Sequence, residues 1–200
     1  MVYFDKHPRS TPLRMAVFAS GEGSNMENIV RYCRHVDRRA EVALVVCNRA
    51  EAGAVGRAQS LGVDCEVISR SLLNDKAGME ALLEAHRVDA IVLAGFLLMI
   101  PEFLISRYRG RILNIHPSLL PRHGGKGMYG RHVHEAVVAA GDTVTGITVH
   151  MVSEACDEGR ILFQAAVDVD AADTPADVER KIHALEAAHY PRVIMDTFFE

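Results

Sequence analysis

Residues 14–25, with the sequence RMAVFASGEGSN, join an apolar run to a glycine-rich turn. The run 14–20 predicts a first β-strand, and the pattern of residues 24–35 predicts a helix directly after the turn. A strand that passes through a short turn into a helix is the first half of a βαβ unit. We therefore expect an α/β domain that begins with this stretch.

Along the rest of the chain, apolar runs rich in β-forming residues alternate with helical patterns, as is typical of βαβ units. The run 90–96 (AIVLAGF) is the most apolar, so we expect it to form the central strand. The other predicted strands are 42–47, 65–68, 111–115, 146–152 and 161–169. The other predicted helices are 52–61, 75–87, a stretch around Pro101 and Tyr108, 131–140, and 174–199 with an interruption near Pro191.

The loop between the last two predicted strands is short enough for an antiparallel hairpin. The pattern as a whole predicts a Rossmann-like α/β fold. Its sheet is open, twisted and mostly parallel, with helices on both faces and an antiparallel hairpin near the C-terminus. Open sheets of this kind bind ligands at the carboxyl ends of their strands.

The composition fits one compact domain, because the chain has 200 residues, of which 49% are hydrophobic and 24% charged. The formal charge of −4 offers no electrostatic footprint for nucleic acid or an anionic membrane, so we expect small-molecule partners. Residues 1–13 lack the apolar core of a signal peptide. We expect a cytoplasmic protein with a flexible leader at 1–13 and a single domain at 14–200.

The loop Ser20-Gly21-Glu22-Gly23-Ser24-Asn25 has two readings. Backbone N–H groups at a glycine-rich helix start can bind a phosphate, and a tight turn capped by Ser24 or Asn25 needs the same residues. A dinucleotide site is disfavoured, because Met26 occupies the place of the third small residue.

Asn114 and His116 lie at the end of a predicted strand, one residue apart, so period-2 alternation places both side chains on the same side. Pro117 restricts His116 to extended backbone geometry. An amide and an imidazolium so placed can both donate to the oxyanion of a tetrahedral intermediate. Equally, both can satisfy backbone groups at a strand terminus.

A histidine used as a cation needs a carboxylate beside it, and the residues alone leave Glu154, Asp157 and Glu158 as candidates. The chain has no nucleophile elbow, so a covalent acyl-enzyme is not indicated. An amine substrate, which is itself a nucleophile, needs none.

The His132-x-His134 pair, with further histidines nearby, raises a metallohydrolase as the alternative class. In a helix, however, residues two apart diverge by about 200°, which prevents shared ligation. We therefore expect no metal.

Several segments together resemble the phosphoribosylglycinamide (GAR) formyltransferases, which depend on 10-formyltetrahydrofolate. They are the loop 20–25, Leu93-Ala94-Gly95-Phe96, Asn114-Ile115-His116-Pro117-Ser118-Leu119-Leu120-Pro121, Gly146-Ile147-Thr148-Val149-His150 and Asp157-Glu158-Gly159. The string from Asn114 to Pro121 is also shared with methionyl-tRNA formyltransferase and formyltetrahydrofolate deformylase. The loop 20–25, which resembles a phosphate-binding loop, and the short chain favour the GAR formyltransferases over these relatives.

The resemblance implies a formyltransferase fold and a catalytic centre of Asn114, His116 and Asp157, and so chooses among the three acids. It implies that Gly23, Ser24, Asn25 and Glu186 bind the ribonucleotide. It implies folate contacts from Leu97, Leu98, Met99, Ile100, Asn114 and, near the glutamate tail, Lys76. Thr148 and His150 would contact the catalytic residues and hold them in place without touching the substrate.

In the implied reaction the glycinamide amine attacks the formyl carbon, Asn114 and protonated His116 stabilise the oxyanion, and Asp157 holds the charge of His116. Hydrolysis of the folate, formylation of another amine and a non-enzymatic folate-binding module are the alternatives, and a homodimer is left open. The stretch 122–130 is longer and richer in glycine than the common family pattern, and Leu98 stands where arginine is frequent.

Overall fold

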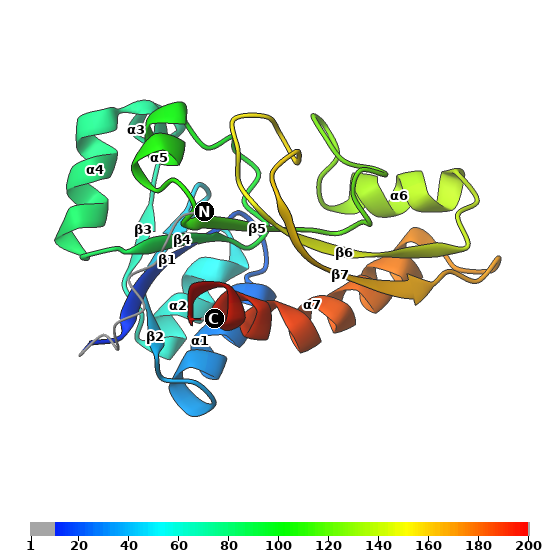
Figure 1. Cartoon of the computed structure of the whole chain (residues 1–200), viewed down its shortest axis with the longest axis horizontal. Helices are drawn as coiled ribbons and strands as arrows, with labels where there is room; N and C mark the ends of the chain where they lie inside the picture. Colours follow the sequence, from blue (N-terminus) through cyan, green and yellow to red (C-terminus); the bar gives the residue numbers. More distant parts are fainter. Residues whose placement is uncertain (1–10, 200) are drawn as a thin grey trace.

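The computed structural model of the chain describes residues 11–199 (Figure 1). Its strands are β1 (Leu13–Ala19), β2 (Ala40–Cys47), β3 (Cys65–Val67), β4 (Ala90–Leu93), β5 (Ile112–His116), β6 (Val144–Met151) and β7 (Ile161–Asp168). Its helices are α1 (Ser24–His35), α2 (Gly53–Leu61), α3 (Arg70–Asn74), α4 (Lys76–Ala85), α5 (Glu102–Arg107), α6 (Arg131–Ala139) and α7 (Pro175–Phe199).

The seven strands form one sheet in the order β3-β2-β1-β4-β5-β6-β7. The first five in this order pair in parallel, whereas β6 is antiparallel to both β5 and β7. Strand β4 is fully buried and lies in the middle of the sheet. The predicted mostly parallel α/β sheet with a hairpin near the C-terminus is confirmed, and so is its central strand.

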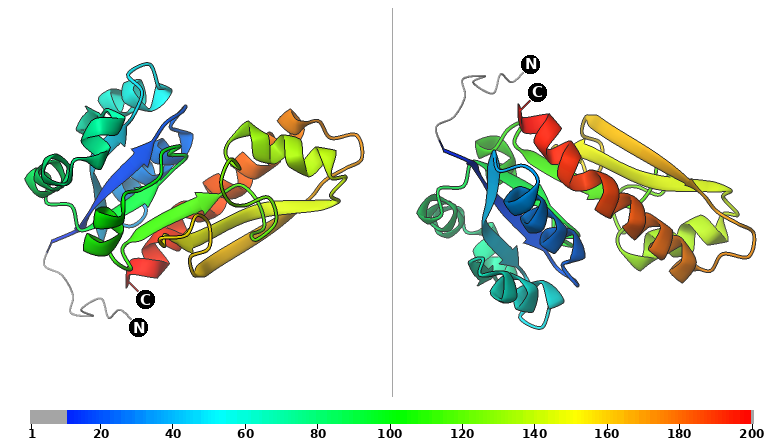
Figure 2. Two further views of the ribbon diagram at one scale, coloured as in Figure 1. Left: turned by 90° about the horizontal axis from the view of Figure 1, so that it is seen from above. Right: turned by 90° about the horizontal axis from the view of Figure 1, so that it is seen from below.

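Helices cover both faces of the sheet, and each face has its own core (Figures 1 and 2). Alternate residues of β1 serve the two cores: Met15 and Val17 pack with α1, α2 and α7, while Ala16 and Phe18 pack with α3, α4 and α5. This double burial explains why the strand sequence is almost continuously apolar.

The N-terminal leader predicted for residues 1–13 lies almost wholly outside the described residues, which begin at residue 11. Leu13 is the first residue of β1 and is 1% exposed, so the strand begins one residue before the expected domain start. No helix within residues 11–199 has the length and hydropathy needed to cross a membrane.

Helix α3 was missed, and α4 is shorter than the helix predicted for residues 75–87. Helix α3 precedes α4, and it begins where the hydroxyl of Ser69 accepts a hydrogen bond from the N–H of Leu72 at 3.1 Å. Asp75 separates the two helices because its backbone is extended, with φ −86° and ψ 104°. Ser69, three residues before the pair Leu72-Leu73, was the sequence signal for this cap.

The predicted interruption of the last helix near Pro191 is wrong, because α7 runs unbroken through this residue. Proline has no N–H and so leaves the carbonyl four residues earlier without its usual helical donor. That carbonyl belongs to Ala187, and Nδ2 of Asn28 on α1 donates to it at 2.8 Å. A neighbouring helix therefore supplies the donor that the proline lacks.

Helix α7 is anchored to the centre of the sheet by the fully buried Tyr190, whose hydroxyl donates to the carbonyl oxygen of Leu93 at 2.8 Å. We expect Tyr190→Phe to lower the free energy of unfolding by about 1 to 2 kcal/mol, because it leaves a buried carbonyl without this donor. Chemical denaturation measures the change. Tyr129→Phe is the matched control, since Tyr129 is 46% exposed. Equal stability of the Tyr190→Phe variant and the wild type would contradict the anchoring role.

Candidate active site

A cavity of about 480 Å³ opens at the carboxyl ends of the central strands β1, β4 and β5, within the size range of small-molecule sites. Its wall combines the loop after β1, residues 94–99 after β4, and the end of β5. The glycine-rich loop 125–130, Asp157 and one face of α7 complete it. The cavity therefore lies at the edge of the sheet where the fold class predicts a ligand.

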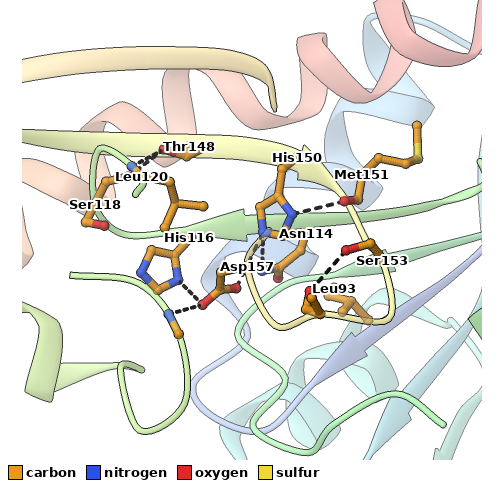
Figure 3. Close-up of polar contacts among 12 residues, drawn as sticks. Leu93, Asn114, His116, Ser118, Leu120, Thr148, His150, Met151, Ser153 and Asp157 are labelled. Atoms are coloured by element: carbon orange, nitrogen blue, oxygen red, sulfur yellow. Dashed lines mark hydrogen bonds and ion pairs between the residues drawn. The ribbon is translucent and has the colours of Figure 1, made fainter. Parts of the chain in front are cut away.

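Asn114 and His116 both line this cavity from the end of β5. Strand β6 pairs with β5 so that His150 lies opposite Asn114 and Thr148 lies opposite His116. Figure 3 shows the four side chains together with Asp157. The antiparallel neighbour thus brings a supporting group to each of the two candidate residues.

His150 fixes the orientation of the Asn114 amide. Its Nδ1 lies 3.1 Å from the carbonyl oxygen of Met151, which can only accept, so in the neutral ring Nδ1 carries the proton. Its Nε2 is then an acceptor for Nδ2 of Asn114, 3.0 Å away. One N–H of the Asn114 amide is committed to His150, and the second remains for the cavity.

Asp157 is the one residue of the three candidate acids that lines the cavity. Its Oδ2 accepts from the backbone N–H of Gly125 at 3.0 Å and lies 3.5 Å from Nδ1 of His116. Its Oδ1 lies 3.6 Å from Nε2 of His150. By contrast, Glu154 and Glu158 are exposed, and Glu154 faces Arg109 at 3.7 Å.

The turn that presents Asp157 is tightly constrained. Asp157 itself has a positive φ of 58°, and a Cβ on Gly159 would lie 1.7 Å from the carbonyl oxygen of Met151. Only glycine fits so close to a neighbouring strand, which explains the Asp-x-Gly spacing.

The His116 ring is 4% exposed, and both of its nitrogens face protein atoms. Nε2 donates to the carbonyl oxygen of His123 at 2.8 Å, and Nδ1 faces Asp157. Burial lowers the pKa of His116 below its ordinary value, although the charge of Asp157 acts in the opposite direction. At neutral pH this favours the neutral ring, whereas the resemblance implied a protonated one.

Burial raises the pKa of Asp157, but the neighbouring rings of His150 and His116 and the hydrogen bond from the N–H of Gly125 more than offset this effect. The net pKa lies below the ordinary value of a carboxyl group, so Asp157 is ionised at neutral pH. The centre therefore joins a carboxylate to a buried imidazole whose second proton would be held at Nδ1.

The loop after β1 presents unpaired backbone donors. Gly23, the N-cap of α1, has φ 78°, and no side chain caps this helix. A Cβ on Gly23 would lie 2.6 Å from Cα of Ala54, so the position requires glycine. Gly23, Ser24 and Asn25 all line the cavity, which makes the start of α1 available to an anion.

Asn25 is bonded elsewhere than at the helix start, because its Nδ2 donates to Oε2 of Glu186 on α7 at 2.8 Å. Glu186 is 7% exposed and lines the cavity, and burial raises its pKa. The structure thus brings together the four residues that the resemblance assigned to the ribonucleotide, which are Gly23, Ser24, Asn25 and Glu186.

The residues expected to contact folate divide into two groups. Leu97, Leu98 and Met99 line the cavity, and Met99 is 64% exposed at its rim. Two expectations are not supported. Ile100 is 8% exposed and packs into the core of one sheet face, because the chain turns inward ahead of α5, and Lys76 lies outside the cavity at the start of α4.

Thr148 is fully buried behind the centre. Its hydroxyl donates to the carbonyl oxygen of Ser118 at 2.7 Å and accepts from the backbone N–H of Leu120 at 3.0 Å. Gln164 on β7 donates to the same hydroxyl at 2.9 Å. Thr148 therefore holds the segment that follows His116, up to the cis peptide bond between Leu120 and Pro121.

The histidines of the His-x-His pair diverge, because they lie on a helix, α6. His132 is exposed and lies 3.5 Å from Glu135, whereas His134 is buried, lines the cavity and has an Nδ1 without a hydrogen-bond partner. In the described part of the chain, no three His, Cys, Asp or Glu side chains are grouped to hold a metal ion.

Sequence reasoning missed three contributors to the site. The carbonyl of His123 and the N–H of Gly125 are backbone groups, so the residue types at these positions do not predict their contacts. His134 was weighed only as a metal ligand. The helical pattern of residues 131–140 was the available signal, because it separates His134 from His132 and turns it inward with Val133 and Val137.

An amide, an imidazole and a carboxylate that meet in a cavity at the edge of an open α/β sheet are typical of an enzyme active site. The model of the formyl transferase family matches residues 13–194, so the chain belongs to the formyl transferase family. Among its members the chain resembles the phosphoribosylglycinamide formyltransferases, as relatives and solved structures show.

The phosphoribosylglycinamide formyltransferase of Bacillus subtilis is 40% identical over 90% of this chain and 92% of its own length. The chloroplastic enzyme of that name from Arabidopsis thaliana is 39% identical, and the match spans 64% of its length. The crystal structure of the phosphoribosylglycinamide formyltransferase from Brucella melitensis superimposes with a TM-score of 0.84 at 36% identity, covering 95% of this chain and 97% of that one.

The opposing effects on His116 give a direct test of the centre. In Asp157→Asn the charge that raises the pKa of His116 is lost while burial persists, so we expect this pKa to fall further below about 6.5. Titration of the His116 Cε1–H resonance by NMR measures it. Glu158→Gln, beside Asp157 but exposed, should leave the titration unchanged. An unchanged or higher pKa in Asp157→Asn would show that the carboxylate does not act on the ring.

The same depressed pKa makes stability depend on pH. The unfolded chain binds a proton at His116 more tightly than the folded chain, so the free energy of unfolding falls as the pH drops below about 6.5, until the folded pKa is reached. Denaturation of the wild type at several pH values should show this loss, and His116→Gln should show less of it.

Proposed function

We propose that this protein is a phosphoribosylglycinamide formyltransferase. It transfers the formyl group of 10-formyltetrahydrofolate to the amine of 5′-phosphoribosylglycinamide, a step of de novo purine biosynthesis. One observation carries the proposal: the Asn114, His116 and Asp157 centre shares a cavity with the uncapped N-terminus of α1. The names of the relatives support the choice of substrate.

The ribonucleotide binds along the side of the cavity formed by α1 and α7. Its phosphate accepts from the N–H groups of residues 23–25, where the helix dipole also favours negative charge. Glu186 then meets the ribose hydroxyls. His134 also lines this side of the cavity.

The folate binds on the opposite side, against residues 97–99. Leu97 and Met99 are 40% and 64% exposed, and a pterin ring covering them would remove apolar surface from water. Asn114 also lines the cavity, and the formyl group must lie within reach of its amide for the oxyanion to accept from it. No metal takes part in the reaction that we propose.

The reaction is direct attack of the glycinamide amine on the formyl carbon. The free N–H of Asn114 donates to the developing oxyanion, and a proton held at Nδ1 of His116 adds a positive charge beside it. Asp157 stabilises that proton. The amine loses one proton and N10 of the folate gains one as the C–N10 bond breaks, so the His116 and Asp157 pair acts as a relay.

A hydrolase that passes the formyl group to water is the second candidate, since the same centre serves it. We expect the purified protein to convert 10-formyltetrahydrofolate to tetrahydrofolate only when phosphoribosylglycinamide is present. Asn114→Ala should lower kcat by about 10²- to 10³-fold, and His116→Ala or Asp157→Ala should abolish turnover. Absorbance of the released tetrahydrofolate measures the rate. Turnover without the amine would favour the hydrolase, and full activity of an Asn114→Ala/His116→Ala variant would refute the catalytic assignment.

The two folate assignments that the structure separates can be tested as a pair. Met99→Ala should raise KM for 10-formyltetrahydrofolate about fivefold, which corresponds to about 1 kcal/mol of lost apolar contact. Lys76→Ala is the control and should leave that KM within about twofold, because Lys76 lies outside the cavity. A larger effect for Lys76 than for Met99 would mean that the folate lies along a different path.

A further inference from the structure

An ion-pair cluster outside the cavity connects to the catalytic histidine through the backbone. Asp142, which follows α6, has a side chain that is 7% exposed and lies 2.6 Å from Nε2 of His123. The guanidinium of Arg122 contacts its other carboxylate oxygen. The hydrogen bonds with His123 and the charge of Arg122 lower the pKa of Asp142, so it is ionised at neutral pH.

His123 has an unusual backbone for a residue with a side chain. Its φ is 50°, in the left-handed region that is uncommon for every residue except glycine, although asparagine, aspartate and histidine adopt it more often than the others. Such a conformation costs about 1 to 2 kcal/mol and persists only when surrounding contacts hold it. The ring of His123 contacts Asp142, which lies outside the loop, and this contact helps to hold the residue in place.

The conformation of His123 matters because its carbonyl oxygen accepts from Nε2 of His116 at 2.8 Å. A carbonyl oxygen can only accept, so this bond keeps a proton on Nε2. Asp157 competes from the other side of the ring, since an acceptor 3.5 Å from Nδ1 favours a proton there. The tautomer of neutral His116 therefore depends on which acceptor is better placed.

We infer that Asp142 is a positioning residue for His116: by holding His123, it aims the carbonyl that keeps the proton of the neutral ring on Nε2. Nδ1 is thereby left as the site that takes up a proton next to Asp157. Asp142 touches neither substrate nor reacting atoms. This inference rests on the proposed role of His116, but the tautomer itself is a property of the protein alone.

Loss of Asp142 would release the strained backbone of His123. Its φ would relax to a negative value, its carbonyl would turn away from His116, and Asp157 would draw the remaining proton to Nδ1. Nε2 would then carry a lone pair in place of an N–H, and Nδ1 would no longer be free to accept the proton of the amine. The proton relay from the amine to N10 would then begin with the His116 proton on Nδ1 instead of Nε2.

Three variants separate positioning from general stability. Asp142→Ala removes the acceptor for His123, Asp142→Asn keeps a neutral one, and Arg122→Gln removes the other partner of Asp142 without touching His123. Circular dichroism and thermal melts of each confirm that the variants are folded.

The decisive measurement is the tautomer of His116, read from long-range ¹H–¹⁵N NMR of the protein without substrates at neutral pH. We expect the Nε2–H form in the wild type and in Arg122→Gln, the Nδ1–H form in Asp142→Ala, and an intermediate state in Asp142→Asn. In the transfer assay, Asp142→Ala should lose about 10- to 100-fold in kcat with KM for the ribonucleotide within twofold, and Asp142→Asn should recover part of it.

An Nε2–H tautomer in Asp142→Ala, or an equal loss of kcat in Arg122→Gln, would overturn the inference. If Asp142→Ala does not fold, an unchanged tautomer in Asp142→Asn overturns it in the same way, and a shifted one supports it. Absence of ribonucleotide-dependent transfer in the wild type would instead refute the proposed function, and the tautomer measurement would still decide the role of Asp142.

Discussion

The register between β5 and β6 is the constraint on which the site depends. It sets His150 opposite Asn114 and Thr148 opposite His116, so that two catalytic candidates on one strand receive two supporting side chains from the next. A slip of one residue in β6 would turn His150 and Thr148 to the other face of the sheet. On its other edge β6 pairs closely with β7, and Gly146 is required there because a Cβ would lie 2.0 Å from the carbonyl oxygen of Ala165.

The switch from parallel to antiparallel pairing also explains where the acid comes from. The carboxyl ends of parallel strands lie at one edge of the sheet. Strand β1 brings the glycine-rich loop 20–25 to this edge, β4 brings residues 94–99, and β5 brings Asn114 and His116. Strand β6 runs the opposite way and ends beside the start of β5, so the loop between β6 and β7 folds back to reach the cavity. It carries Asp157 to His116, although 40 residues lie between the two in the sequence.

Local rules sufficed for most of the fold and for part of the site. Strand alternation placed Asn114 and His116 together, and the helical pattern bounded α1 at Ser24 and His35 as observed. Local rules failed at Pro191. There Asn28, which is 159 residues away from Ala187 in the sequence, donates to the carbonyl of Ala187 and keeps the helix intact. The same rules could not choose Asp157 from its neighbours, because what distinguishes it is a set of tertiary contacts with His116, His150 and Gly125. Neither Lys76 nor Ile100 lines the cavity, because closeness in sequence to a ligand loop does not determine where the chain turns.

The electrostatics of the centre are balanced between two requirements. A charge beside the oxyanion is worth most where water is excluded, and burial of the His116 ring provides that environment. The same burial lowers the pKa of the ring and so withholds the charge at neutral pH. A fixed imidazolium would also repel an ammonium substrate, whereas a neutral ring with an unprotonated Nδ1 can take up the proton that the attacking amine loses. The charge would then arise as the oxyanion forms, with Asp157 already ionised beside it. Such a centre needs the ring in one tautomer before the substrate arrives, which is why the backbone carbonyl of His123 matters as much as any side chain in the cavity.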